Sequence, residues 1–153
     1  MNIDEILSPE RACSNLQASS KKKAIELVSE KISLSLPQLK SGHMYRGLID
    51  REKLGTTAIG EGVAIPHCRL DDCQQITGGL FVFNTSIDFS APDEKGVNII
   101  FALVVPKHES SQHLKTLSAL ANFFSKPSNR YELLNAGNDQ KLYHAALKIG
   151  AGQ

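Results

Sequence analysis

The pattern of apolar positions predicts two helices in the first third of the chain. Ser19 and Ser20 are candidate N-caps of a helix, and Pro37 suits the start of a second helix that ends near Gly55. Three consecutive lysines, Lys21 to Lys23, occupy the first turn of the first helix and oppose its dipole. Each helix has an apolar face, formed by Ala24, Ile25, Val28 and Ile32 in the first and by Leu39, Met44, Leu48 and Ile49 in the second.

Short β-prone segments begin at Thr56. Residues 56–59 and 63–65 are separated by the turn signal Gly60-Glu61-Gly62, and Pro66 ends the second segment. The strongest strand candidates are residues 79–83 and 97–105. The second candidate is an almost continuous apolar run, which is typical of a central strand covered on both faces.

Helical spacing returns after residue 110. Ser110 or Ser111 is expected to cap a helix that Pro127 ends, a short helix follows around residues 131–134, and a last helix begins near Asp139. Helices, then strands, then helices in one chain predict an α/β fold in which a sheet is sandwiched by helices. We expect a single domain over residues 1–153.

Composition narrows the class of protein. A hydrophobic share of 41% and a charged share of 22% exclude intrinsic disorder, and a net charge of +1 argues against nucleic acid as a partner. The apolar run from Ile99 to Val105 is far shorter than the ~20 residues needed to cross a bilayer, and the N-terminus lacks the features of a signal peptide. Three cysteines indicate free thiols, so we expect a cytoplasmic protein without membrane insertion.

The densest cluster of unusual residues ends at His67. Pro66 has a fixed φ and restricts Ile65, so the backbone that enters His67 is stiff. Neutral histidine is a good nucleophile near pH 7, and a stiff approach helps such a ring to meet an incoming group. The residues alone leave the alternative that His67 caps a loop or forms hydrogen bonds within the core.

Two further residues suit an anion site. His113 lies in the first turn of a predicted helix, where the positive helix end favours a nearby anion. Arg51 could bind phosphate through two parallel hydrogen bonds. Both residues could equally be ordinary surface residues. A zinc site needs four ligands in paired spacing, and no second pair of ligands accompanies Cys68 and Cys73, so we expect no metal. No dinucleotide-binding or Walker motif occurs, so we expect no cofactor.

The segment Arg51 to His67, REKLGTTAIGEGVAIPH, resembles the phosphorylation-site signature of enzyme IIA domains of the bacterial sugar phosphotransferase system. The resemblance is to the mannitol/fructose class, which includes the nitrogen-regulatory enzyme IIA, and it is closest to that branch. It continues at residues 22–26, 101–106 and 113–118, and it spans roughly residues 3–148. It implies an α/β sandwich with a mixed sheet.

The resemblance also assigns roles to four residues. It makes His67 the phosphoryl acceptor and donor, and it makes His113 and Arg51 the residues that stabilise the phosphate. Thr57 matches a threonine of the signature, and we expect it to contact the substrate. This chain has Glu61, Val63 and Cys68 where the family often has Asn, Ile and Gly, and Glu61 is expected to point away from the site or to pair with Arg51.

The resemblance implies reversible phosphoryl transfer without a nucleotide or a metal. The expected partners are an HPr-like phosphocarrier of the nitrogen type (NPr type) as donor and target proteins regulated by the phosphorylation state. The free-standing chain, with no fused IIB domain, favours this regulatory function. One alternative is a fructose- or mannitol-specific IIA that passes phosphate to a IIB domain, and another is a binding module that does not use the histidine. The sequence leaves the oligomeric state open.

Overall fold

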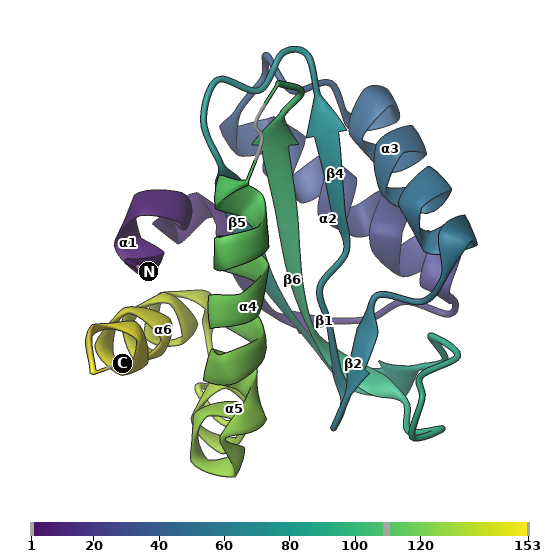
Figure 1. The fold of residues 1–153 in the computed structure, drawn as a ribbon. Helices are drawn as coiled ribbons and strands as arrows, with labels where there is room; N and C mark the ends of the chain where they lie inside the picture. The colour runs from purple at the N-terminus through teal and green to yellow at the C-terminus, as the bar shows by residue number, and fades with distance from the viewer. Residues whose placement is uncertain (1, 109–110, 153) are drawn as a thin grey trace.

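The computed structural model describes residues 2–108 and 111–152, and its strands form a 6-stranded mixed sheet (Figure 1). The order is β1-β5-β6-β3-β2, and β4 also pairs with β6. The β1–β5, β3–β6 and β4–β6 pairs are parallel, whereas the β5–β6 and β2–β3 pairs are antiparallel. The bounds are β1 Ala12–Leu16, β2 Ala58–Gly60, β3 Val63–Ala64, β4 His67–Leu70, β5 Thr77–Ile87 and β6 Val97–Pro106.

Helices cover both faces of this sheet, which confirms the predicted α/β sandwich (Figure 1). The helices α2 (Lys21–Ser35) and α3 (Ser41–Leu54) pack on one face. On the other face lie α1 (Ile3–Ile6), α4 (Gln112–Ser125), α5 (Pro127–Leu134) and α6 (Asp139–Ala151). None of the helices in the described part of the chain is both long and apolar enough to span a membrane.

Strand β6 lies in the middle of the sheet and contributes to both apolar cores. Ile100, Ala102 and Val104 belong to the core under α2 and α3. The alternate residues Ile99, Phe101, Leu103 and Val105 belong to the core under α1, α4, α5 and α6. Because successive side chains of a strand point to opposite faces, a strand buried on both sides requires a continuous apolar run. The prediction from that run is therefore confirmed.

The helices α2 and α3 follow their local signals to different degrees. Ser20 caps α2 as predicted, because its Oγ accepts a hydrogen bond from the backbone N–H of Lys23 at 3.1 Å. The predicted start of the second helix at Pro37 is wrong, since α3 begins at Ser41. A turn closed by the Leu39 N–H and the Leu36 carbonyl, 2.9 Å apart, buries Leu39 before the helix begins.

Several elements lack a local signal strong enough to predict them. No element was expected before Ser19, yet α1, a 3₁₀ turn at Pro9–Arg11 and β1 build one edge of the fold. Strand β4 follows Pro66, where the sequence pattern predicted that extended structure stops. The helix after residue 110 begins at Gln112, and its N-cap Ser111 makes no capping hydrogen bond through its side chain. The other predicted cap, Ser110, lies outside the described residues.

Candidate functional site

An interruption between two strand segments places His67. Both β3 and β4 run parallel to β6, with Ala64 opposite Ile100 and His67 opposite Leu103. Pro66 lies between the two segments and has no N–H to donate to a neighbouring strand. Its carbonyl still accepts a hydrogen bond from the Leu103 N–H at 2.9 Å. The backbone on the N-terminal side of His67 is therefore anchored to the central strand.

The ring of His67 is held in one tautomer. Its Nδ1 lies 2.8 Å from the carbonyl oxygen of Ile65. A carbonyl oxygen can only accept, so Nδ1 carries the hydrogen and Nε2 keeps its lone pair. Partial burial lowers the pKa of His67, and Arg51 and His113 lower it further, against opposing effects of the Ile65 hydrogen bond and of Glu52. His67 therefore presents a neutral nucleophilic nitrogen near pH 7.

A pocket of about 380 Å³ lies beside this ring, where α3 and the start of α4 approach strand β4. It brings together three residues that are far apart in the sequence, namely Arg51, His67 and His113. All three were predicted to belong to one site. The full lining consists of Gly47, Asp50, Arg51, Leu54, His67, Cys68, Arg69, Leu103, Val105 and His113.

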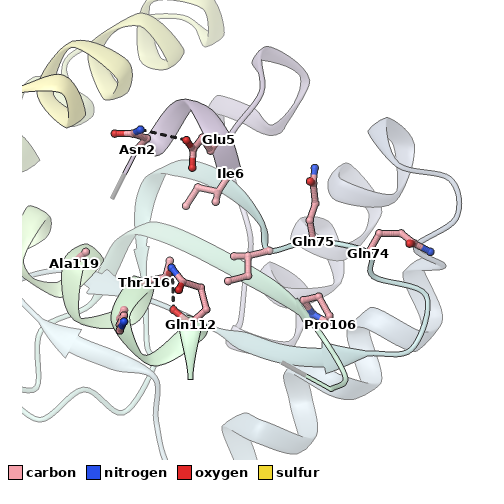
Figure 2. Close-up of a pocket in the computed structure, with 11 residues that line it drawn as sticks. Asn2, Glu5, Ile6, Gln74, Gln75, Pro106, Gln112, Thr116 and Ala119 are labelled. Carbon is pink, nitrogen blue, oxygen red and sulfur yellow. Dashed lines mark hydrogen bonds between the residues drawn. The ribbon is translucent and has the colours of Figure 1, made fainter. Parts of the chain in front are cut away.

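A larger pocket, of about 560 Å³, lies between α1, the β4–β5 loop and the other side of α4 (Figure 2). Its polar lining includes Glu5, Gln75 and Gln112. It contains no residue of the phosphorylation-site signature. The smaller of these two pockets is therefore the candidate functional site, because it contains the histidine with a fixed tautomer and a lowered pKa.

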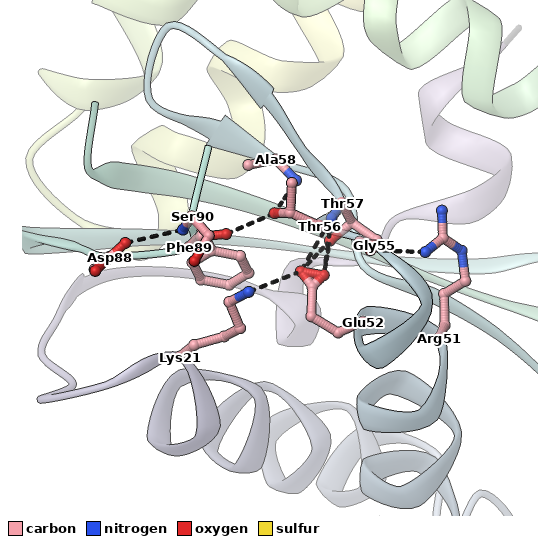
Figure 3. A network of polar contacts seen from close by, with 10 residues as sticks. All are labelled: Lys21, Arg51, Glu52, Gly55, Thr56, Thr57, Ala58, Asp88, Phe89 and Ser90. Carbon is pink, nitrogen blue, oxygen red and sulfur yellow. Dashed lines mark hydrogen bonds and ion pairs between the residues drawn. The ribbon is translucent and has the colours of Figure 1, made fainter. Parts of the chain in front are cut away.

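Arg51 enters the pocket from the last turn of α3. Its Nη1 donates a hydrogen bond of 2.9 Å to the carbonyl of Gly55, the C-cap residue of the same helix (Figure 3). This contact uses one of the five N–H donors of a guanidinium group. The loop after α3 therefore holds the Arg51 side chain beside the pocket.

Thr57, which was expected to contact the substrate, lies outside the pocket lining. Its side chain is buried, it is absent from the pocket lining, and its backbone N–H and hydroxyl both donate to the carboxylate of Glu52 at 2.8–3.0 Å (Figure 3). The Lys21 Nζ lies 3.7 Å from that carboxylate and 5.2 Å from the centre of the Phe89 ring. In this structure Thr57 therefore fixes the loop beside Arg51 and makes no contribution to the pocket wall.

His113 is the second residue of α4 and meets an arginine that was not predicted. The Arg69 Nη2 lies 3.4 Å from Nδ1 and 3.3 Å from Nε2 of His113. The Arg69 Nη1 donates to the carbonyl of Lys107 at 3.2 Å. The sequence could have indicated Arg69, because it lies two positions after His67. That spacing places both side chains on one face only if these residues form a strand.

Cys68 forms part of the pocket wall next to α3. It is buried against α3, and burial raises the pKa of its thiol to about 12. A Cβ added to Gly47 of α3 would lie 3.0 Å from Cys68 Cβ and 3.1 Å from its Sγ. The absence of a side chain at Gly47 therefore makes room for the cysteine. Among residues 2–108 and 111–152, no three His, Cys, Asp or Glu side chains gather in a way that could hold a metal ion.

Glu61 points away from the pocket. It occupies the β2–β3 turn with a left-handed φ of 57°. Its carboxylate lies 3.3 Å from Lys95 Nζ and 3.8 Å from Arg130 Nη2. The expected alternative, a pair with Arg51, is not formed.

Comparisons with known proteins find relatives along almost the whole chain. The chain is 32% identical over 153 residues to a nitrogen regulatory protein of Pseudomonas aeruginosa, covering 100% of this chain and 99% of that protein. It is 36% identical over 146 residues to the nitrogen regulatory protein of Escherichia coli K12, covering 94% and 88%. The crystal structure of the nitrogen regulatory protein IIA-Ntr from Neisseria meningitidis superposes with a TM-score of 0.85 at 35% identity, covering 94% of this chain and 97% of that one.

A family model gives the broader classification. The model described as "Phosphoenolpyruvate-dependent sugar phosphotransferase system, EIIA 2" matches residues 5–148, which is nearly the whole chain. This match includes every residue of the signature that ends at His67. The resemblance found in the sequence is thereby confirmed, and the chain belongs to the EIIA type 2 family of the phosphoenolpyruvate-dependent sugar phosphotransferase system.

Proposed function

We propose that this chain is a regulatory phosphocarrier of the nitrogen-type phosphotransferase system. In the proposal, His67 accepts a phosphoryl group from an HPr-like carrier of the nitrogen type in the cytoplasm, and the phosphorylation state controls target proteins. Membership of the family makes the chain a phosphotransfer protein. The similarity to nitrogen regulatory proteins along the full chain supports the regulatory branch. The observation that carries the proposal is the Nδ1–Ile65 hydrogen bond, which leaves Nε2 of His67 as the nucleophile.

The proposed step exchanges one N–P bond for another. The lone pair on Nε2 of His67 attacks the phosphorus of the phosphohistidine on the carrier, and the carrier's N–P bond breaks. The leaving imidazole of the carrier keeps that electron pair. The Nδ1 proton of His67 stays in place, and the Ile65 carbonyl stabilises the positive charge that the ring acquires. No external proton, nucleotide or metal is needed to balance the step.

Positioning and charge stabilisation supply most of the catalysis in phosphoryl transfer. Arg51 has guanidinium donors for the phosphoryl oxygens. His113 lies at the N-terminal end of α4, where the helix dipole favours an anion. Burial beside Leu103 and Val105 limits access of water to the bond that forms.

The same step supplies a signal. Phosphorylation adds roughly −1.5 to −2 charges at one position, by analogy with other phosphorylated residues. The whole chain carries a formal charge of only +1, so this change is large for its surface. Phosphorylation can therefore determine which target protein binds, because one target can prefer the phosphorylated chain and another the unphosphorylated chain.

The test is phosphoryl labelling from radioactive phosphoenolpyruvate with enzyme I and the nitrogen-type carrier. We expect one label per wild-type chain and none on His67→Ala, with His144→Ala on α6 as a control that is labelled normally. Labelling of His67→Ala at one site elsewhere would overturn the assignment. Rapid transfer of the label onward to a sugar-specific IIB domain and then to a sugar would favour a transport function instead. A wild-type chain that takes no label would be a binding module.

A further inference from the structure

Arg69 is a charged residue of the pocket lining that lies outside the Arg51–His67 signature. Its guanidinium group contacts His113. We propose that Arg69 is a further phosphate-binding residue, and that it also orients His113 for donation to the phosphoryl group. This inference rests on the proposed phosphorylation of His67. It extends that proposal because it assigns two tasks to a residue outside the Arg51–His67 signature on which the site was predicted.

The strand places Arg69 beside the nucleophile. His67 and Arg69 are two positions apart on β4 and therefore point to the same face of the sheet. Their partners on β6 are Leu103 and Val105, which line the same pocket. Cys68, between them, is buried in the core on the opposite face. The side chains of His67 and Arg69 therefore lie on the same side of β4, and both line the pocket.

The contact with His113 has a direction. A guanidinium group has only donors, so whichever ring nitrogen receives the Arg69 hydrogen bond must carry a lone pair. The other nitrogen of the neutral ring then carries the hydrogen and can donate it. The Lys107 carbonyl accepts from Nη1 of the same guanidinium at 3.2 Å and limits its rotation. Arg69 is thereby held against the His113 ring, and the ring nitrogen that does not accept from Arg69 is the one that can donate.

This geometry surrounds the phosphoryl group with donors from three elements. Arg51 comes from α3, Arg69 from β4 and His113 from α4. In phosphoryl transfer the negative charge is spread over three equatorial oxygens, while one N–P bond breaks and another forms in line. Donors that come from different directions can each meet a different oxygen. A single arginine binds at most two oxygens through its paired N–H groups.

Arg69 is also exposed, so it could instead bind the carrier protein. The two functions differ kinetically. A docking residue changes the carrier concentration needed for half-maximal rate, whereas a phosphate-binding residue that acts in the transition state lowers the maximal rate. A general effect of the lower net charge would also appear when one positive charge is removed away from the pocket.

The experiment measures the rate of transfer from the phosphorylated carrier at several carrier concentrations. The variants are Arg69→Gln, which removes the charge, and Arg69→Lys, which keeps the charge but loses the paired N–H groups. The charge-matched control is Lys141→Gln, at an exposed residue of α6, a helix that contributes no residue to the pocket lining. The ¹⁵N shifts of the His113 ring report its tautomer in each variant. Circular dichroism checks that each variant is folded.

We expect the maximal rate to fall on the order of tenfold or more for Arg69→Gln, as for loss of one donor to a developing oxyanion. Arg69→Lys should lie between that variant and wild type, Lys141→Gln should match wild type, and Arg69→Gln should change the His113 ¹⁵N shifts. An unchanged maximal rate, with or without weaker carrier binding, would overturn the inference, as would equal effects of Arg69→Gln and Lys141→Gln. If wild-type His67 takes no label at all, the proposed function itself fails, which is a distinguishable result.

Discussion

The carboxylate of Glu52 accepts hydrogen bonds from both the backbone N–H and the hydroxyl of Thr57, at 2.8–3.0 Å. Glu52 is buried at the end of α3 and Thr57 is buried in the loop that follows. Lys21, at the first position of α2, lies 3.7 Å from the same carboxylate. This network ties two helices to the loop whose Gly55 carbonyl holds Arg51. Lys21, at the start of α2, therefore has a buried structural partner.

Glu52→Gln should destabilise the protein by about 2 kcal/mol, because the hydrogen bonds of Thr57 lose a charged acceptor and Lys21 loses its ion pair. Urea unfolding measures the change. The matched control is Glu26→Gln, since Glu26 is half exposed and pairs with Lys23 at 3.9 Å. That exposed pair should contribute less than about 0.5 kcal/mol. Equal midpoints for the two variants would show that the buried network is not stabilising.

His113→Ala should slow phosphoryl transfer to His67 by about 10- to 100-fold, because one donor to the phosphoryl oxygens is lost. His113 is only partly buried, so the free energy of unfolding should change by less than about 1 kcal/mol. Single-turnover transfer from the phosphorylated carrier measures the first effect, and urea unfolding measures the second. His144→Ala, an exposed histidine on α6, controls for the loss of an imidazole. A His113→Ala rate equal to that of wild type would remove His113 from the site.

The imidazole of His67 should titrate below the ordinary histidine pKa of about 6.5, because burial and the neighbouring Arg51 and His113 disfavour its protonated form. NMR titration of its ring protons measures this midpoint. The folded protein therefore binds this proton less readily than the unfolded chain. Consequently His67 favours unfolding as the pH falls below about 6.5, and this effect is absent well above that pH.

The same sample in urea provides the reference for that titration. All five histidines should then titrate near 6.5. A midpoint for folded His67 at or above the value in urea would contradict the neutral nucleophile, and with it the direction of the pH effect.

Gly47→Ala should destabilise the protein by about 1–3 kcal/mol, as for overpacking of a core contact. The added Cβ would lie 3.0 Å from Cys68 Cβ, so α3 would have to move away from β4. Gly42→Ala is the matched control on the same helix, because its added Cβ would meet nothing within 4 Å. That change should stabilise the helix by roughly 0.5–1 kcal/mol.

The double variant Gly47→Ala with Cys68→Gly tests the cause of the destabilisation. Removal of the cysteine side chain should relieve the overlap, so the two substitutions together should be less destabilising than the sum of each alone. Additive effects in urea unfolding would mean that the helix and the strand do not compete for this space.

Much of the fold could be predicted because it depends on local patterns. The N-cap at Ser20 and the apolar run of β6 each act within a few residues, and both appear in the structure as expected. Strand β4 was missed because it has only four residues and directly follows a proline. Its extended conformation comes from pairing with β6, more than 30 residues later in the chain.

The candidate site likewise has one part that the local sequence predicts and one part that it does not. The sequence by itself determined that a histidine follows a stiff Ile65-Pro66 step, and that an arginine and a threonine precede it within one signature. Only the tertiary structure decided that Thr57 is buried against Glu52 and that Arg69 meets His113, 44 residues away. The physical reason is that backbone stiffness is a property of neighbouring residues. Burial and side-chain pairing, in contrast, depend on how β4 and the two helices beside it pack together.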